Sequence, residues 1–381
     1  MGWNGNRRLP SMEMETMLRR LVLPSLIATA LVLAAPPHAR SQDTTLTDAR
    51  QWANFAYGDS VTFNIEVWAP SVLTSARLVV TVAGQDTPYS ESPAIMPATQ
   101  VKLSQTVAVG SLLLPPFADL SYYWEFSDET NRTYRTAPQS LRYEDTTVPW
   151  TWVGVSQDGV TVYTNGQDDA LTRAALDVAT AAFRQMRRTL GVPQPETIIV
   201  YVYPELAPLA NSLRLHGRRV QDWMAAYALP SQHIALVAAG PGSEMLVNLQ
   251  RDLPHEVTHL IIGAAAGEHH ENVPAWFNEG LALMSAREPD LALHSVLETA
   301  IREKALLPIE ALCVNSFSSF PPQEAALAYA QSESLMRYIT NRYGAAQIST
   351  LLNAYASGQS CAGAVQQVLG LSLAELQTQW H

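Results

Sequence analysis

The segment Leu253–Leu260 reads Leu-Pro-His-Glu-Val-Thr-His-Leu, and it constrains this chain more than any other segment. Apolar residues recur at helical spacing around it, which predicts a helix over about residues 243–264. Residues four apart lie on one face of a helix, so the imidazoles of His255 and His259 can bind one small metal ion. Glu256 lies beside that ion. Two imidazoles and an adjacent carboxylate are the groups that a hydrolase needs to activate water on zinc.

Pro254 conflicts with a regular helix, because a proline inside a helix removes one backbone hydrogen bond and costs about 3 kcal/mol. Two arrangements accommodate it. The helix bends at Pro254, or it restarts with Pro254 in its first turn. A restart would place His255 near the positive end of the helix dipole, which disfavours a bound cation. We therefore favour one kinked helix.

A catalytic zinc ion needs a third protein ligand and an open fourth position. A third histidine six residues after His259 is absent, because that position is Ala265. The cluster Glu268–Glu271, which reads Glu-His-His-Glu, is one alternative source, although it has the composition of a polar loop. The preferred candidate is Glu279, in the run Pro-Ala-Trp-Phe-Asn-Glu-Gly-Leu-Ala. A second helix over about residues 275–286 would return its carboxylate to the first helix.

These two segments together resemble the gluzincin metallopeptidases, the zincin group in which a glutamate is the third zinc ligand. More closely they resemble the bacterial peptidase-MA-like proteins, and the runs Ala328–Leu335 and Leu373–Trp380 resemble that family as well. The resemblance implies an α+β zincin-like peptidase domain over residues 148–381, with an α-helical part over 291–381. It implies one Zn²⁺ per chain and a peptide or protein substrate.

The resemblance also implies how the reaction proceeds. Zinc lowers the pKa of its bound water to about 7, and Glu256 takes the proton of this metal-activated water as general base. Many gluzincins stabilise the oxyanion with a tyrosine or histidine, and Tyr329 is the candidate here; a tyrosine that only packs is the alternative. The related M1-type aminopeptidases carry a G-x-M-E-N run, which the segment 239–245 does not match. Endopeptidase and exopeptidase activity both stay open.

The strand expected over His233–Ala238 precedes the active helix. In zincins an exposed edge strand beside that helix pairs with extended substrate. By this fold analogy we expect His233–Ala238 to be that edge strand.

Residues 45–147 show a different pattern. Apolar and polar residues alternate over Val61–Trp68, Leu78–Val82 and Leu120–Phe126, which indicates strands with one buried face. About seven short strands in this length favour an immunoglobulin-like β-sandwich, although the Cys–Trp–Cys signature of antibody domains is absent. A protein that binds partners through this sandwich, with a catalytically silent zincin-like platform behind it, is the alternative function. The presence of Glu256 argues against it, because a structural zinc has no use for a base.

The N-terminus has the pattern of an export signal. Arg19 and Arg20 precede the apolar run Leu21–Ala35, and small residues at Ala39 and Ser41 predict cleavage before residue 42. The signal then spans residues 1–41, with Met12, Met14 and Met17 as alternative translation starts. The run of 15 residues is shorter than a bilayer span of about 20. We expect a secreted, periplasmic or cell-surface protein, and an uncleaved N-terminal anchor is the alternative.

Charge and cysteine content add two expectations. The net charge of −11 gives no electrostatic basis for binding nucleic acid or anionic membranes. Cys313 and Cys361 are the only cysteines, and in an exported chain this even number fits a disulfide. Two buried free thiols are the alternative. No partner protein can be inferred.

Overall fold

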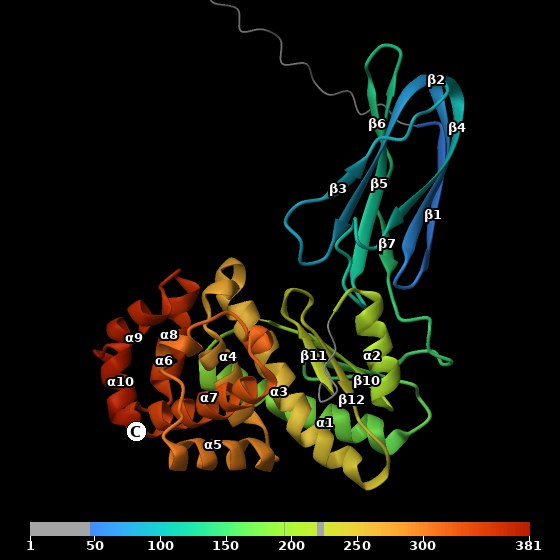
Figure 1. Cartoon of the computed structure of the whole chain (residues 1–381). Coiled ribbons are helices and arrows are strands. Elements are labelled where there is room, and N and C mark those ends of the chain that lie inside the picture. Colours follow the sequence, from blue (N-terminus) through green and yellow to red (C-terminus); the bar gives the residue numbers. More distant parts are fainter. Residues whose placement is uncertain (1–45, 194, 219–224) are drawn as a thin grey trace, which may run out of the picture. The chain divides into compact units, whose positions relative to one another are not determined.

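The computed structural model describes residues 46–193, 195–218 and 225–381. The predicted export signal over residues 1–41 lies outside this part of the chain. None of the described helices is both long and apolar enough to cross a membrane. Figure 1 shows a strand-rich region made by the first part of the described chain and a mixed region made by the rest.

Seven strands in the first region form one antiparallel sheet. Side chains alternate between buried and partly exposed along most of β2 and β5, as the sequence pattern predicts. The strands are β1 (Asp48–Ala56), β2 (Ser60–Val82), β3 (Tyr89–Glu91), β4 (Ala98–Ala108), β5 (Asp119–Asp128), β6 (Thr133–Arg135) and β7 (Gln139–Arg142).

The structure does not confirm an immunoglobulin-like sandwich of two sheets. The chain does not turn between the two alternating segments around residue 70, and β2 continues through both as one strand of 23 residues. Its first part pairs with β1 and β4, and the part after Leu73 pairs with β5 and β3. The register shifts near Leu73 allow β2 to pair with both sets of neighbouring strands. All seven strands therefore belong to a single hydrogen-bonded sheet.

The second sheet has five strands in the order β11-β12-β10-β9-β8. Its central strand β10 is parallel to both of its neighbours, β9 and β12. Crossovers between parallel strands usually contain a helix, and α1 (Asp169–Leu190) lies in the one between β9 and β10. The strands are β8 (Val153–Gln157), β9 (Val160–Thr164), β10 (Ile198–Tyr203), β11 (Ala226–Leu229) and β12 (Ile234–Ala238).

The prediction of an edge strand over His233–Ala238 is wrong. All five residues of β12 are buried, and the strand lies between β11 and β10. The edge strand on this side is β11, which also packs against α3 (Met245–Ala266). Neither an edge nor a central position can be read from apolar content alone, because the neighbours of a strand are chosen in three dimensions.

Ten helices complete the described chain (Figure 1). They are α1 (Asp169–Leu190), α2 (Leu206–Leu215), α3 (Met245–Ala266), α4 (Ala275–Ser285), α5 (Leu291–Glu303), α6 (Ile309–Leu312), α7 (Pro322–Tyr343), α8 (Ala346–Ala356), α9 (Cys361–Leu369) and α10 (Leu373–Trp380). Helix α3 packs against α1, β11 and β12, and α4 packs against both α3 and α7. The predicted helices over about 243–264 and 275–286 correspond to α3 and α4, and α5 to α10 lie in the α-helical part expected over 291–381, but α2 was not expected. The large core of this region places α3 and α4 side by side.

A set of buried and part-buried hydrogen bonds joins the loop after β1 to the end of α2. The hydroxyl groups of Tyr57 and Ser212 lie 2.7 Å apart. Gly58 N–H donates to the Tyr143 hydroxyl, which lies 3.0 Å from His216 Nε2. The other ring nitrogen of His216 donates to the Ser212 carbonyl at 2.8 Å. His216 Nε2 therefore accepts the Tyr143 proton, an arrangement that requires a neutral imidazole.

Candidate metal centre

Helix α3 is one continuous helix with Pro254 inside it, as favoured from the sequence. Because Pro254 has no N–H, the Gln250 carbonyl one turn earlier is free to bond elsewhere, and it accepts from Arg287 N–H at 3.0 Å. The Pro254 carbonyl accepts from the hydroxyls of Thr258 at 2.8 Å and Ser285 at 3.0 Å. The end of α4 and the chain just after it are thus tied to the turn of α3 before the first histidine. From the sequence alone we assign no role to Thr258 or Ser285.

The close packing of α4 on α7 explains why the residue after Glu279 is a glycine, Gly280. A Cβ atom at this position would lie 2.3 Å from the Ser332 carbonyl oxygen of α7. Only a residue without a side chain allows the two helix backbones to approach so closely. Helix α4 is therefore seated on α7 at the residue next to Glu279.

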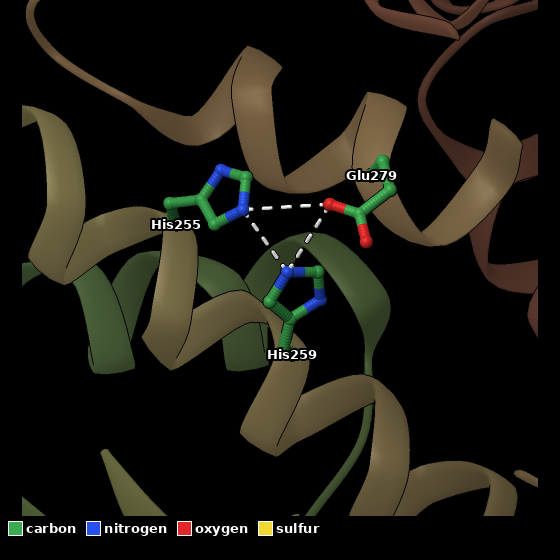
Figure 2. Close-up of side chains that lie close together, drawn as sticks. All are labelled: His255, His259 and Glu279. Carbon is green, nitrogen blue, oxygen red and sulfur yellow. Dashed lines mark hydrogen bonds and ion pairs between the residues drawn. The ribbon is translucent and has the colours of Figure 1, made fainter. Parts of the chain in front are cut away.

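Three side chains from α3 and α4 converge (Figure 2). The Nε2 atoms of His255 and His259 lie 3.0 Å apart. Glu279 Oε2 lies 3.5 Å from the first of these nitrogens and 3.4 Å from the second. Ligands at 2.0–2.1 Å around a tetrahedral zinc ion would be about 3.3 Å from one another. The spacing and the donor types of the three side chains therefore fit one zinc ion.

Asn278 orients one of the two histidines. His259 Nδ1 lies 3.0 Å from Asn278 Oδ1, to which its N–H can donate. This hydrogen bond places the proton of a neutral imidazole on Nδ1 and leaves the lone pair of Nε2 pointing at the other two donors. Helix α4 therefore supplies one of the three converging donors and orients another.

The charges within the cluster are strongly coupled. Burial raises the pKa of Glu279, but the neighbouring His259 and His255 outweigh it and hold that pKa far below its ordinary value. Burial lowers the pKa of His259, but the Glu279 carboxylate outweighs it and raises that pKa to about 9. A site in which a buried carboxylate remains ionised beside two imidazoles favours the binding of a cation.

A family model described as the Peptidase MA superfamily matches residues 178–381. The chain belongs to this superfamily. The match confirms the relationship that the two motifs indicate, and with it the expected class of enzyme, a zinc metallopeptidase. No curated protein sequence matches the chain.

Among solved structures, the chain is similar to an M1 zinc metallopeptidase from Deinococcus radiodurans. The two share 13% identity with a TM-score of 0.40, over 84% of this chain and 89% of that chain. A mutant of that enzyme with a bound Tyr-Ser-Ala substrate shares 13% identity with a TM-score of 0.41, over 85% of this chain and 90% of the other.

Glu256 of this peptidase is 7% exposed and is not one of the three converging donors. Burial raises the pKa of its carboxyl group, although the two histidines oppose this shift. A carboxylate with a raised pKa accepts a proton more readily near neutral pH. Glu256 directly follows His255 in the sequence, and its role as general base stays a prediction.

Tyr329 of this peptidase lies on α7, the helix that α4 packs against. Its ring contacts Phe317 edge-on at a centroid distance of 5.4 Å. Burial raises the pKa of its hydroxyl, and the charges of Glu279 and Glu256 raise it further. The tyrosine is therefore within electrostatic reach of the cluster, and its role as oxyanion donor stays a prediction.

The alternative ligand cluster Glu268–Glu271 does not join the site. These residues lie in the 3-10 segment Gly267–Asn272 after α3. Among the described residues, the group of side chains that could hold a metal ion contains none of them. His270 lies beside Gly263 of α3, and its Nε2 is buried without a hydrogen-bond partner. Burial lowers the pKa of this imidazole, and the charge of His259 lowers it further. The structure thus favours Glu279 over the cluster as the third donor.

Proposed function

We propose that this protein is an exported zinc metallopeptidase that hydrolyses peptide bonds with Glu256 as general base. The observation that carries the proposal is the convergence of two imidazole nitrogens and one carboxylate oxygen at spacings of 3.0 to 3.5 Å, with a buried carboxylate beside them. Membership of the Peptidase MA superfamily supports it.

His255, His259 and Glu279 would hold the metal ion. A bound Zn²⁺ would supply Lewis acidity, which lowers the pKa of water to about 7. Glu256 receives a proton from that water and delivers it to the leaving nitrogen of the substrate. Tyr329 keeps its own proton, because its pKa is raised, and donates a hydrogen bond to the substrate carbonyl oxygen as negative charge develops there.

The decisive experiment combines metal analysis with hydrolysis of an unstructured, casein-like protein. We expect one zinc ion per chain, turnover by the wild type and loss of turnover with a chelator. Glu256→Gln should keep the zinc and lose about 10²–10⁴-fold in turnover, because the amide cannot accept the proton. Glu268→Gln is the matched control, since it removes an exposed carboxylate outside the site and should leave turnover unchanged.

Two outcomes would contradict the proposal. Full activity of Glu256→Gln would remove Glu256 from the mechanism. One zinc per wild-type chain without turnover of any unfolded substrate would favour the alternative function, a zincin-like platform that binds partners without catalysis.

A further inference from the structure

One disulfide holds the first turn of α4, the turn that precedes Glu279. It does so through one contact next to Cys313 and one contact at Cys361. Cys313 and Cys361 are bonded to each other across 48 residues of chain. The residue after Cys313 is Val314, and its carbonyl accepts a hydrogen bond from Ala275 N–H at 2.6 Å. Ala275 is the first residue of α4, so one end of the disulfide anchors the start of this helix.

The other end of the disulfide also contacts α4. The indole N–H of Trp276 donates to Cys361 Sγ at 3.3 Å. Trp276 has no exposed surface, so no solvent can replace this acceptor. The next residue, Phe277, lies against Tyr355 of α8 with a centroid distance of 5.4 Å. The Cys361 side of the disulfide therefore holds the second residue of the same helical turn.

Glu279 follows Ala275 and Trp276 by about one helical turn, so a movement of this turn changes where its carboxylate lies. The position of α4 relative to α3 determines the distance from Glu279 Oε2 to the two histidine nitrogens. The rest of α4 has its own anchors, the close approach at Gly280 in the middle of the helix and the Ser285 hydrogen bond at its end. The contacts with Cys361 and with Val314 lie in the first turn.

We propose that the Cys313–Cys361 disulfide is a positioning element of the metal centre, which holds α4 so that Glu279 is preorganised for zinc. The inference rests on the proposed function, because it takes zinc as the bound ion. Groups that orient metal ligands typically change metal affinity by about 10–100-fold when removed. A reduced disulfide leaves α4 attached to α7, so we expect a loss of zinc affinity within this range and retention of the fold.

A purely structural role for the disulfide makes a different prediction. In the chain-entropy model a disulfide stabilises a protein by restricting its unfolded state. Such an effect lowers the melting temperature when the bond is lost, but it leaves the zinc dissociation constant of the folded protein unchanged. Zinc affinity of the folded protein therefore separates the two roles.

The experiment measures the zinc dissociation constant of the full chain by competition with a chromophoric chelator. Oxidised wild type, wild type reduced with a phosphine that carries no thiol, and reoxidised wild type are compared, with circular dichroism as the monitor of folding. Reduction should weaken zinc binding tenfold or more, and reoxidation should restore it. The double variant Cys313→Ser, Cys361→Ser should show the same weakened binding and no response to the reductant.

Two further variants test whether the disulfide acts on Glu279 through α4. Trp276→Phe keeps the disulfide but removes the donor to Cys361, so it should weaken zinc binding severalfold and respond less to reduction than the wild type. The absorption spectrum of bound Co²⁺ should change in this variant and in the reduced wild type. Val162→Ala, which removes buried methyl groups from β9 away from both ligand helices, is the control for general destabilisation. It should lower the melting temperature and leave zinc affinity unchanged.

Reduced protein that remains folded and binds zinc within twofold of the oxidised protein overturns the inference, even if it melts at a lower temperature. Unchanged affinity and an unchanged Co²⁺ spectrum in Trp276→Phe also overturn it, and this variant covers the case in which the reduced chain unfolds. Wild-type protein that binds no zinc overturns the proposed function itself, so the two failures are distinguishable.

Discussion

His259 Nδ1 and Asn278 Oδ1 form a hydrogen bond of 3.0 Å between α3 and α4. Asn278 directly precedes Glu279, so neighbouring residues of α4 orient one ligand and provide another. The two helices that hold the site are therefore coupled at the ligands themselves. They are coupled again where the Ser285 hydroxyl, at the end of α4, donates to the Pro254 carbonyl inside α3.

We expect Asn278→Ala to lower zinc affinity by about 10–100-fold, because the His259 ring loses the acceptor that fixes its orientation and tautomer. Asn278→Asp keeps an acceptor oxygen at the same place and should retain most of the affinity. The zinc dissociation constants of both variants check this prediction. Equal affinity in Asn278→Ala and wild type would show that the ring is oriented by other contacts.

Glu279→Ala should lower zinc affinity by orders of magnitude, because one of three protein ligands is lost. Metal content after dialysis is the measurement. The matched controls are His269→Ala and Glu271→Ala in the alternative cluster, which should retain one zinc ion each. If Glu279→Ala retains full zinc while a cluster variant loses it, the third ligand has been assigned to the wrong residue.

Gly280→Ala should destabilise the protein by about 1–3 kcal/mol, because the new methyl group would overlap the Ser332 carbonyl unless α4 and α7 separate. This separation moves Glu279, so zinc affinity should fall as well. Gly110→Ala is the control, since no atom lies within 4 Å of a Cβ at that position. Denaturant unfolding and zinc titration of both variants test the prediction, and it fails if Gly280→Ala is as stable as the control.

The contact between Tyr143 and His216 should make stability depend on pH. Burial lowers the pKa of His216, although its hydrogen bond to Ser212 opposes the shift. The unfolded chain, with a histidine pKa of about 6.5, then binds a proton more readily than the folded one, so stability falls as pH drops through about 6.5. Unfolding midpoints at pH 7.5 and 5.5 measure the effect. His216→Gln should show a smaller difference between the two pH values, and an equal difference would exclude His216 as a contributor.

Protein recovered outside the cytoplasm should begin near residue 42, because the small residues at Ala39 and Ser41 mark the predicted cleavage site. N-terminal sequencing of this material is the measurement. Replacing Arg19 and Arg20 by glutamate should retain the protein in the cytoplasm, since the positive charges before the apolar run are lost. Uncleaved wild-type protein found only in the cytoplasm would contradict export.

The sequence by itself determined the features that depend on local spacing. The pairing of His255 with His259 follows from helical periodicity, and the alternation over β2 and β5 follows from the twofold repeat of a strand. Glu279 was found because it lies in a second motif whose helix could return to the first.

Tertiary structure alone decided the features that depend on which segments become neighbours. The alternation of apolar and polar residues predicts which face of β2 is buried. It does not predict that β2 pairs with two different sets of strands in one sheet. The apolar run of β12 fits an edge or a central strand equally well, and only the packing of β11 beside α3 selects between them. The links from Thr258 to Ser285 and from Trp276 to Cys361 join residues far apart in the chain. Their contacts arise from the packing of helices, which no local spacing encodes, because each contact depends on the whole core being formed.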